Sequence, residues 1–315
     1  MSEPLKILVI RLSSIGDIVL TTPVVRCLKK QLNAEVHFLT KQDFFCLLEN
    51  NPYIQQLHAI EDGLEKLKIL GFDWIIDLHH NFRTSKLKKA LGVPSKSFYK
   101  LNIEKWLLTT FKINRLPKKH IVDRYLETVA HLGVTNDKLG LDYFLAENEA
   151  LPNELELPEK YVALVIGGQH ATKILPTDRL QEVCRKVNLP IVLVGGPEDR
   201  SSGEEIAQNQ TEVINTCGDL SINQSAYLIK HAQKVITHDT GMMHISAAFK
   251  KEIISIWGNT VPEFGMYPYL SSEQSKILEV KNLSCRPCSK IGYKKCPKGH
   301  FKCMNQIDLN LFSRE

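Results

Sequence analysis

Short apolar runs of strand length alternate with helical periodicity along the whole chain. In the first half the predicted strands are 6–11, 35–39, 56–60 and 74–78, and in the second half 161–166, 190–194, 213–216, 234–237 and 252–256. These runs show little polar alternation, which is typical of parallel strands covered on both faces. The pattern therefore predicts an α/β protein with parallel sheets.

Amphipathic segments fill the spaces between these strands. The predicted helices are 23–31, 44–49, 64–70, 84–91, 122–132, 179–187, 204–208, 222–232 and 242–249. Gly133 is a C-terminal cap signal, and Ser221 followed by Gln224 is a capping box. The stretch 147–159, which contains two prolines, is typical of a linker. We therefore expect a first domain at 1–150 and a second at 151–315.

Composition excludes several classes of protein. Apolar residues make up 43% of the 315 residues and charged residues 24%, values that do not fit collagenous, coiled-coil or disordered chains. No stretch approaches the ~18 apolar residues of a membrane span. The N-terminus shows neither a basic n-region nor a small-residue cleavage site, so we expect a cytoplasmic protein.

The net charge of +5 hides an uneven distribution. Residues 83–119 hold eleven basic side chains and one acid, and residues 276–302 hold eight basic side chains and one acid. The remainder of the chain is acidic. The first segment is explained by an anionic ligand, an anionic membrane surface or a solvated basic face, and the purpose of the second stays open.

Three loops that follow predicted strands are rich in small and polar residues. The first contains Ser13, Ser14, Gly16 and Asp17. For a lone aspartate at a helix start, capping is the commoner explanation, and a general base is the functional alternative.

The second loop is Gly167-Gly-Gln-His-Ala-Thr-Lys173, and the third is His238-Asp-Thr-Gly-Met-Met-His244. Glycines with a lysine are ingredients of a phosphate cradle, although the spacing fits no nucleoside-triphosphate loop, and an exposed lysine in a turn is equally expected. Thr240 and Gly241 would offer backbone N–H groups at a helix N-terminus, which favours an anion. The residues alone thus predict a phosphorylated ligand and leave the reaction open.

Taken together and in order, these motifs resemble glycosyltransferase family 9, the heptosyltransferases of lipopolysaccharide core assembly. The resemblance rests on the following segments: Ser13-Ser14-x-Gly16-Asp17, Asp77-Leu-His-His-Asn-Phe-Arg83-Thr-Ser85, Lys173, Gly195-Gly196-Pro197-Glu198, Asp239-Thr240-Gly241-x-x-His244, Trp257-Gly258-Asn-Thr260-x-Pro262 and the cysteine tail. It implies a GT-B architecture, with two Rossmann-like doubly wound domains facing a cleft.

The resemblance also implies an inverting, metal-independent transfer that needs no cofactor. A sugar, heptose among the candidates, would move from a nucleotide-diphosphate donor to a lipopolysaccharide-core or related glycolipid. Asp17 would be the general base, and Lys173 would neutralise the diphosphate leaving group. The implied donor-binding residues are Glu198, Asp239, Thr240, Gly241 and His244.

The first domain would bind the acceptor through Ser13, Ser14, Gly16, Arg83 and Lys86, with Lys88 as a further cation for an anionic glycolipid. Such a substrate implies peripheral association with the inner face of the cytoplasmic membrane and no nucleic-acid partner. Two alternatives stay open at this point. One is a GT-B-type sugar-nucleotide epimerase or hydrolase, and the other is a non-catalytic nucleotide- or nucleic-acid-binding protein.

The cysteines of the tail, Cys285, Cys288, Cys296 and Cys303, form a separate question. Their close first pair is typical of zinc sites, but the later spacings are irregular. Reduced thiols that pack a C-terminal subdomain explain the pattern as well. A structural metal on these four residues is the less favoured of the two interpretations.

Overall fold

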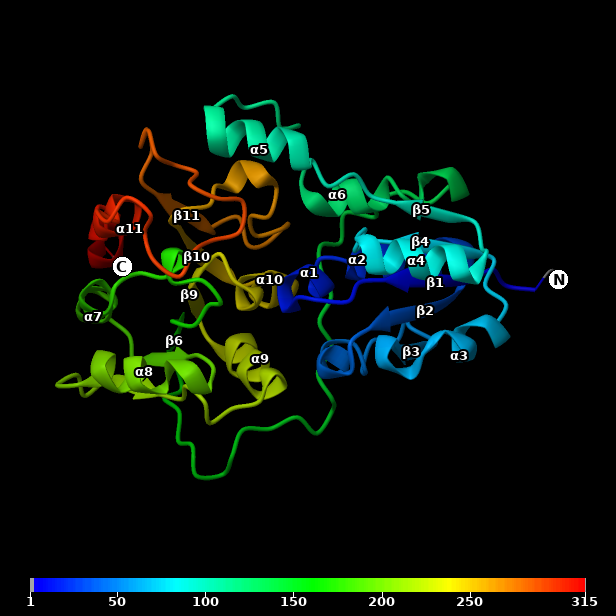
Figure 1. Cartoon of the computed structure of the whole chain (residues 1–315). Helices are drawn as coiled ribbons and strands as arrows, with labels where there is room; N and C mark the ends of the chain where they lie inside the picture. The colour runs from blue at the N-terminus through cyan, green and yellow to red at the C-terminus, as the bar shows by residue number, and fades with distance from the viewer. Residues whose placement is uncertain (1–2, 315) are drawn as a thin grey trace. The chain divides into compact units, whose positions relative to one another are not determined.

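The structure is a computed structural model that describes residues 3–314, with side chains through residue 312. The chain divides into two compact units. Unit 1 holds residues 3–100 and 119–146, and unit 2 holds residues 101–118 and 147–314. Each unit is built on its own parallel sheet with helices packed against it (Figure 1).

Unit 1 contains a five-stranded parallel sheet in the order β3-β2-β1-β4-β5. Its strands are β1 (Lys6–Ile10), β2 (Glu35–Thr40), β3 (Gln56–Ala59), β4 (Trp74–Asp77) and β5 (Ser95–Ser97). Its helices are α1 (Ile15–Val19), α2 (Thr22–Leu32), α3 (Leu64–Ile69), α4 (Phe82–Leu91) and α6 (Ile121–Leu126), with short 3-10 turns η1 (Gln42–Leu47), η2 (Ile60–Asp62) and η3 (Ala130–Leu132). The central strand β1 pairs on both sides, with Ile7 opposite Val36 and Trp74.

Unit 2 contains a six-stranded parallel sheet in the order β11-β10-β9-β6-β7-β8. Its strands are β6 (Val162–Val165), β7 (Ile191–Val194), β8 (Val213–Asn215), β9 (Lys234–His238), β10 (Glu252–Trp257) and β11 (Lys276–Glu279). Its helices are α5 (Asn102–Phe111), α7 (Thr177–Lys186), α8 (Arg200–Ala207), α9 (Ile222–His231), α10 (Gly241–Ala248) and α11 (Lys302–Asn305), with 3-10 turns η4 (Ala171–Lys173), η5 (Pro197–Asp199), η6 (Pro262–Phe264) and η7 (Asn310–Arg314).

Both faces of the unit 2 sheet are buried, as its apolar strands predict. Along β6, Val162 and Leu164 belong to one core cluster, whereas Ala163 and Val165 belong to another. The first cluster includes side chains of α7, α8 and α11, and the second includes side chains of α9. Successive residues of a strand point to opposite faces, so a strand between two helical layers has no polar position.

The predicted strands are confirmed to within about two residues at each end, and the α/β class with them. Two edge strands, β5 and β11, were not predicted, because both are short and polar or half-exposed. The predicted helix 44–49 is wrong in type, since a 3-10 turn stands there. The predicted helix 122–132 is broken into α6 and η3, although Gly133 does end it in the left-handed region with φ of 81°.

Residues 101–118 need a correction, because the sequence-based division placed them in the first domain. They contain α5, whose buried Leu108 packs with Val261 and Phe264 of unit 2. The Lys112 ammonium donates to the carbonyl oxygens of Pro287 at 2.8 Å and Cys285 at 3.3 Å. Buried apolar contact and backbone carbonyls together attach this segment to unit 2.

We expect Ser221→Ala to lower the free energy of unfolding by about 1 kcal/mol, the usual value of a helix N-cap. The Ser221 hydroxyl accepts from the Gln224 N–H at 3.1 Å, and the Gln224 side chain accepts from the Ser221 N–H at 3.0 Å. Urea denaturation measures the change. The matched control is Ser202→Ala, an exposed position inside α8 where no cap is lost, and an equal loss in both variants would contradict the cap assignment.

Candidate functional site

The strand order reverses once in each unit, between β1 and β4 in unit 1 and between β6 and β9 in unit 2. At such a point the loops leaving neighbouring strands diverge and open a crevice at the carboxyl edge of the sheet, where ligands bind in open α/β sheets. The loops after these four strands carry most of the predicted site residues. Each unit therefore presents one candidate half-site.

In unit 1 the Asp17 carboxylate lies in the first turn of α1 and is held by two neighbours. The Arg11 guanidinium forms an ion pair with Asp17 Oδ2 at 2.7 Å, and the Ser14 hydroxyl donates to the same oxygen at 2.9 Å. The cap interpretation of Asp17 is wrong, because Ser14 occupies the N-cap position. Asp17 is instead a paired carboxylate whose side chain stays 22% exposed and thus reachable by a substrate.

Arg11 is the buried anchor of this half-site. Its Nε donates to the Ser13 carbonyl at 2.7 Å, and its Nη1 donates to the Leu78 carbonyl at 2.6 Å and to the Tyr125 hydroxyl at 3.1 Å. One guanidinium thus ties the loop after β1 to the loop after β4. From the sequence, Arg11 is only a cation that could hold an anion. Its role as a buried anchor is recognised from the partners that the fold brings to it.

The loop after β4 is organised by Asp77, which is fully buried. Its carboxylate accepts from the N–H groups of His79 and His80 and from the Thr84 hydroxyl, and it pairs with the Lys88 ammonium at 2.8 Å. Burial alone would raise the pKa of Asp77, but these bonds, led by that of Lys88, lower it. Lys88, named above as a further cation for an anionic acceptor, is thus paired with a buried carboxylate, and its binding to an acceptor stays a prediction.

His79 is a residue that the sequence analysis quoted only within a motif. Its side chain is half-buried, and burial together with the charges of Arg11 and Lys100 lowers its pKa to about 4. The charge of Asp17 also acts on it, in the opposite direction. The imidazole is consequently neutral at pH 7 in the neighbourhood of Asp17, and its position directly after a strand was the signal available in the sequence.

The remaining predicted acceptor residues lie at the start of α1 and on α4. Gly16 is buried inside α1, whereas Ser14 is exposed at its start. Arg83 and Lys86 are exposed on α4, and the Lys86 ammonium lies 4.5 Å from the centre of the Phe82 ring. These two cations have the exposure that an anionic group arriving from solvent requires.

In unit 2 the predicted lysine and aspartate meet. The Lys173 ammonium pairs with Asp239 Oδ2 at 2.6 Å and donates to the Asp239 carbonyl at 3.2 Å. The Thr260 hydroxyl donates to the same carboxylate oxygen at 2.8 Å. These contacts join the loops after β6, β9 and β10. Thr260, which stands in a sequence motif without a predicted role, is therefore part of the half-site.

The N-terminus of α10 stands beside this pair. Thr240 is its N-cap, Gly241 its first residue, and His244 lies one turn later and is buried. A Cβ on Gly168 would lie 3.3 Å from the Thr240 methyl group, so the glycine-containing loop after β6 approaches this helix end closely. Backbone N–H groups and the positive end of the helix dipole favour a phosphate here.

Glu198 lies in η5, the 3-10 turn that follows the adjacent strand β7, and it is exposed. Its neighbour Asp199 accepts from the Gly196 N–H at 2.8 Å and thereby shapes the turn. A Cβ on Gly195 would lie 2.8 Å from Asp199 Cβ and 2.9 Å from Cys217 Sγ, which explains a glycine at that position. A Cβ on Gly196 would lie 2.6 Å from Glu198 Oε2, so the Glu198 carboxylate lies against this glycine.

The loop that carries Lys173 is supported by the cysteine tail. Thr172 donates its N–H to the Tyr293 carbonyl at 3.2 Å and accepts from the Tyr293 N–H at 2.8 Å through its hydroxyl. A Cβ on Gly292 would lie 2.5 Å from the Cβ of His170, so only glycine permits this approach. The tail thus positions the loop whose last residue is the predicted catalytic lysine.

His238 supports the same loop from below. It is fully buried, and its Nε2 accepts from the Leu175 N–H at 3.0 Å. Burial lowers its pKa to about 4, so the ring is a neutral acceptor at pH 7.

The four cysteines of the tail are free thiols. Cys303 is buried, and burial raises its pKa to about 11, as it does for Cys288. Cys288 donates to the Cys285 carbonyl at 2.9 Å, and Cys285 lies 3.8 Å from His300 Nε2. Among the residues that the structure describes, no three His, Cys, Asp or Glu side chains gather as ligands of a metal would.

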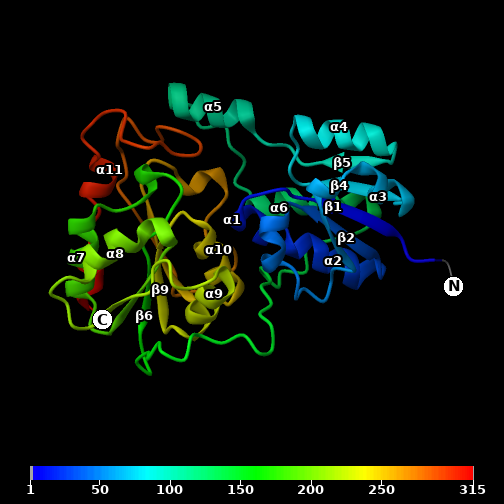
Figure 2. The same cartoon turned by 60° about the horizontal axis from the view of Figure 1, so that its bottom comes forward.

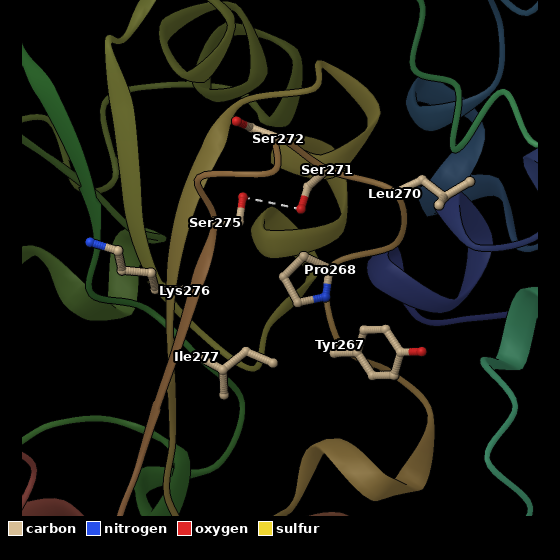
Figure 3. A pocket seen from close by; sticks show the side chains of 8 residues that line it. All are labelled: Tyr267, Pro268, Leu270, Ser271, Ser272, Ser275, Lys276 and Ile277. Atoms are coloured by element: carbon tan, nitrogen blue, oxygen red, sulfur yellow. Dashed lines mark hydrogen bonds between the residues drawn. The ribbon is translucent and has the colours of Figure 1, made fainter.

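A small hollow of about 220 Å³ lies elsewhere in unit 2, beside β11. Figure 3 shows Tyr267, Lys276 and Ile277 on its walls and the hydrogen bond of 3.1 Å between Ser271 and Ser275. None of the predicted site residues lines it. The charged loops at the strand ends remain the better candidate for chemistry.

Two parallel sheets with charged loops at their switch points define the class, a two-domain Rossmann-like protein. The solved structure of the glycosyl transferase family 9 protein from Veillonella parvula DSM 2008 covers 99% of this chain and 96% of its own, with a TM-score of 0.77 and 22% identity. The structure of E. coli ADP-heptose lps heptosyltransferase II covers 99% of this chain and 100% of its own, with a TM-score of 0.71 and 20% identity. These likenesses establish the GT-B fold.

The family follows from the sequence comparisons. The model of glycosyltransferase family 9 (heptosyltransferase) matches residues 64–298. Lipopolysaccharide heptosyltransferase 3 of Escherichia coli (strain K12) is 26% identical over 275 residues, which cover 78% of this chain and 80% of that protein. The chain therefore belongs to glycosyltransferase family 9 and is a glycosyltransferase, as the sequence motifs indicated.

The neutral state of His238 predicts a pH dependence of stability. Its pKa is lowered from 6.5 to about 4 on folding, so its contribution is present above pH 6.5 and is lost as the pH falls toward 4. Between pH 7 and pH 5 the protein should lose about 2 kcal/mol of unfolding free energy through this group. His238→Asn should remove that part of the loss in urea denaturation at the two pH values.

The control for this measurement is His231→Asn, which changes an exposed histidine on α9. That variant should keep the full pH dependence of the parent protein. The assignment is contradicted if His238→Asn loses as much stability between pH 7 and pH 5 as the parent does.

Proposed function

We propose that this glycosyltransferase transfers a heptose from an ADP-linked donor to an acceptor of the lipopolysaccharide core, with inversion and without a metal ion. The relatives include lipopolysaccharide heptosyltransferases, and one similar solved structure carries ADP-heptose in its name. The observation that carries the mechanism is the placement of Asp17 and of the Lys173–Asp239 pair at the two switch points.

Unit 1 would bind the acceptor. Asp17 accepts the proton of the acceptor hydroxyl while that oxygen attacks the anomeric carbon of the donor. Arg11 and Ser14 hold the carboxylate in position. Arg83 and Lys86, exposed on α4, attract the anionic groups of the glycolipid.

Unit 2 would bind the donor. As the new bond to the anomeric carbon forms, the bond from that carbon to the diphosphate oxygen breaks, and the electron pair leaves on the diphosphate. Lys173 and the N-terminus of α10, at Thr240 and Gly241, stabilise this charge where other enzymes use a divalent ion. Asp239 and His244 bind donor sugar or phosphate, and Glu198 binds the nucleoside.

The acceptor is a glycolipid, so we further propose that the enzyme works at a membrane surface. No helix in residues 3–314 has the length and apolar character needed to cross a bilayer. Attachment would then be peripheral, through charge and interfacial side chains.

Asp17→Asn should lower kcat by about 10²–10⁴-fold, the usual contribution of a general base. Lys173→Ala should lower kcat by about 10²–10³-fold, because one preorganised charge at the leaving group is lost. Product formation from ADP-heptose and a lipopolysaccharide-core precursor is followed by mass spectrometry. Omission of the acceptor should abolish turnover, which separates transfer from epimerisation or hydrolysis.

Lys66→Ala, on the exposed surface of α3, is the matched control and should retain parental activity. Thermal unfolding shows whether each variant is folded. If a folded Asp17→Asn or Lys173→Ala enzyme keeps kcat within about threefold of the parent, a change of under 1 kcal/mol in the barrier, the corresponding role is wrong.

A thermal-shift experiment tests the donor. Binding to the native state alone stabilises it by about 2.7 kcal/mol at a ligand concentration of 100 Kd, which corresponds to several degrees in Tm. ADP-heptose should shift the Tm more than UDP-, GDP- or dTDP-sugars do, and Lys173→Ala should reduce the shift. A larger shift with another base would replace ADP in the proposal, and no shift at millimolar concentration would overturn the donor site.

A further inference from the structure

Parts of both cationic segments lie together in unit 2. The 101–118 segment, which contains α5, lies beside the 281–302 segment of the cysteine tail in both views (Figures 1 and 2). The Lys112 ammonium joins them through the carbonyls of Pro287 and Cys285. A hollow of about 390 Å³ is lined by both, by Leu108 and Asn114 of the first segment and Lys281 and Pro287 of the second, together with Glu263 and Glu279. We call this combined surface the α5–tail face.

The α5–tail face is strongly cationic. Its two segments hold eleven basic side chains and a single acid, Glu104. Two of these cations are already engaged. The Arg286 side chain is 6% exposed and paired with Glu279 at 2.7 Å, and Lys112 donates to the carbonyls of Pro287 and Cys285. Lys290, Lys294, Lys295 and Lys298 are exposed, and within residues 3–314 the structure gives none of these four an ion-pair partner. Their charge is therefore available to an anionic partner.

Large apolar side chains project from the same face. While Leu108 points into unit 2, Ile103, Trp106 and Phe111 of α5 are exposed, together with Ile291 and Tyr293 of the tail. The exposed fractions of these five side chains lie between 41% and 63%. The Trp106 and Phe111 rings pack edge to face, with their centroids 5.1 Å apart, and both rings stay exposed.

Lysines beside exposed aromatic and aliphatic side chains favour a membrane surface as the partner. Tryptophan and tyrosine favour the boundary between headgroups and acyl chains, and lysines around them bind anionic headgroups. A nucleic acid would use the lysines and the aromatic rings, but it offers nothing to the exposed isoleucines at positions 103 and 291. A ten-residue helix with one buried and one exposed apolar side is suited to lie in the interface rather than to cross it.

We propose that the α5–tail face docks unit 2 on the surface of a bilayer that contains anionic lipid. Trp106, Phe111 and Ile103 enter the headgroup boundary, and the tail lysines bind the headgroups. The inference rests on the proposed function in one respect, which is that a glycolipid acceptor is presented by a membrane. It assigns a role to the lysines of the tail, which take no part in the catalytic roles proposed above.

Vesicle co-sedimentation tests the proposal. The parent protein should bind vesicles of phosphatidylcholine with 30% phosphatidylglycerol at least tenfold more tightly than vesicles of phosphatidylcholine alone, and less tightly at high salt. Replacing Trp106 and Phe111 by serine, or the lysines at 290, 294, 295 and 298 by glutamine, should each weaken binding at least tenfold. The emission of Trp106 should shift to the blue on binding.

The matched control changes residues of the same kinds in unit 1, namely Ile69→Ser with Lys66→Gln and Lys68→Gln, all on α3. This variant should bind vesicles as the parent does. If it loses as much binding as the face variants, or if the face variants bind normally, the proposal is wrong. Binding of single-stranded RNA in place of the vesicles would also overturn it.

Activity toward a water-soluble, delipidated acceptor separates this inference from the proposed function. The face variants should retain parental kcat on that acceptor, because their residues lie outside the catalytic loops. Loss of vesicle binding with intact soluble activity supports the proposal. Normal vesicle binding by a parent protein that transfers no sugar would leave the docking face standing and overturn the proposed function.

Discussion

One kind of interaction sets the geometry of both half-sites, a cation paired with a carboxylate at the point where the strand order reverses. In unit 1 it joins Arg11 to Asp17 at 2.7 Å, and in unit 2 it joins Lys173 to Asp239 at 2.6 Å. A half-buried charge is costly unless it is paired, so each loop adopts the shape that completes its pair. The pairs therefore hold the chemically useful groups in place before any substrate arrives, and a charged substrate must share or displace one partner.

The cysteine tail links this arrangement to the rest of unit 2. Its inner residues, Cys303 and Met304, are buried in the core under β6 and β10. A Cβ on Gly258 would lie 2.5 Å from the Met304 methyl group and 2.8 Å from the Thr172 carbonyl, so core, tail and lysine loop touch at one glycine. The outer residues of the same tail form the cationic surface. A single segment thus connects the loop that carries Lys173 to the face that we assign to the membrane.

The hydrophobic pattern alone predicts the main strands and helices. Each central strand is recognisable because it is buried on both faces and forms an uninterrupted apolar run. The pattern was insufficient for β5 and β11, which lie at sheet edges and bury little. The loops that hold the site residues were also predictable from their position after strands. Their pairing was not, since Asp17 is held by Arg11 and Thr260 reaches Asp239 only through the strand order.

The sequence does not determine which basic side chains are paired within the fold and which stay available. The basic run at 83–119 looks like one patch, yet Lys88 neutralises the buried Asp77 and Lys112 binds backbone carbonyls, while Arg83 and Lys86 stay exposed. The run is also divided between the two units. A count of lysines cannot separate cations that complete the fold from cations available to a partner, because that depends on which carboxylates and carbonyls the chain brings beside them. The α5–tail face consequently joins residues 175 positions apart in the sequence, through the contact of Lys112 with Pro287.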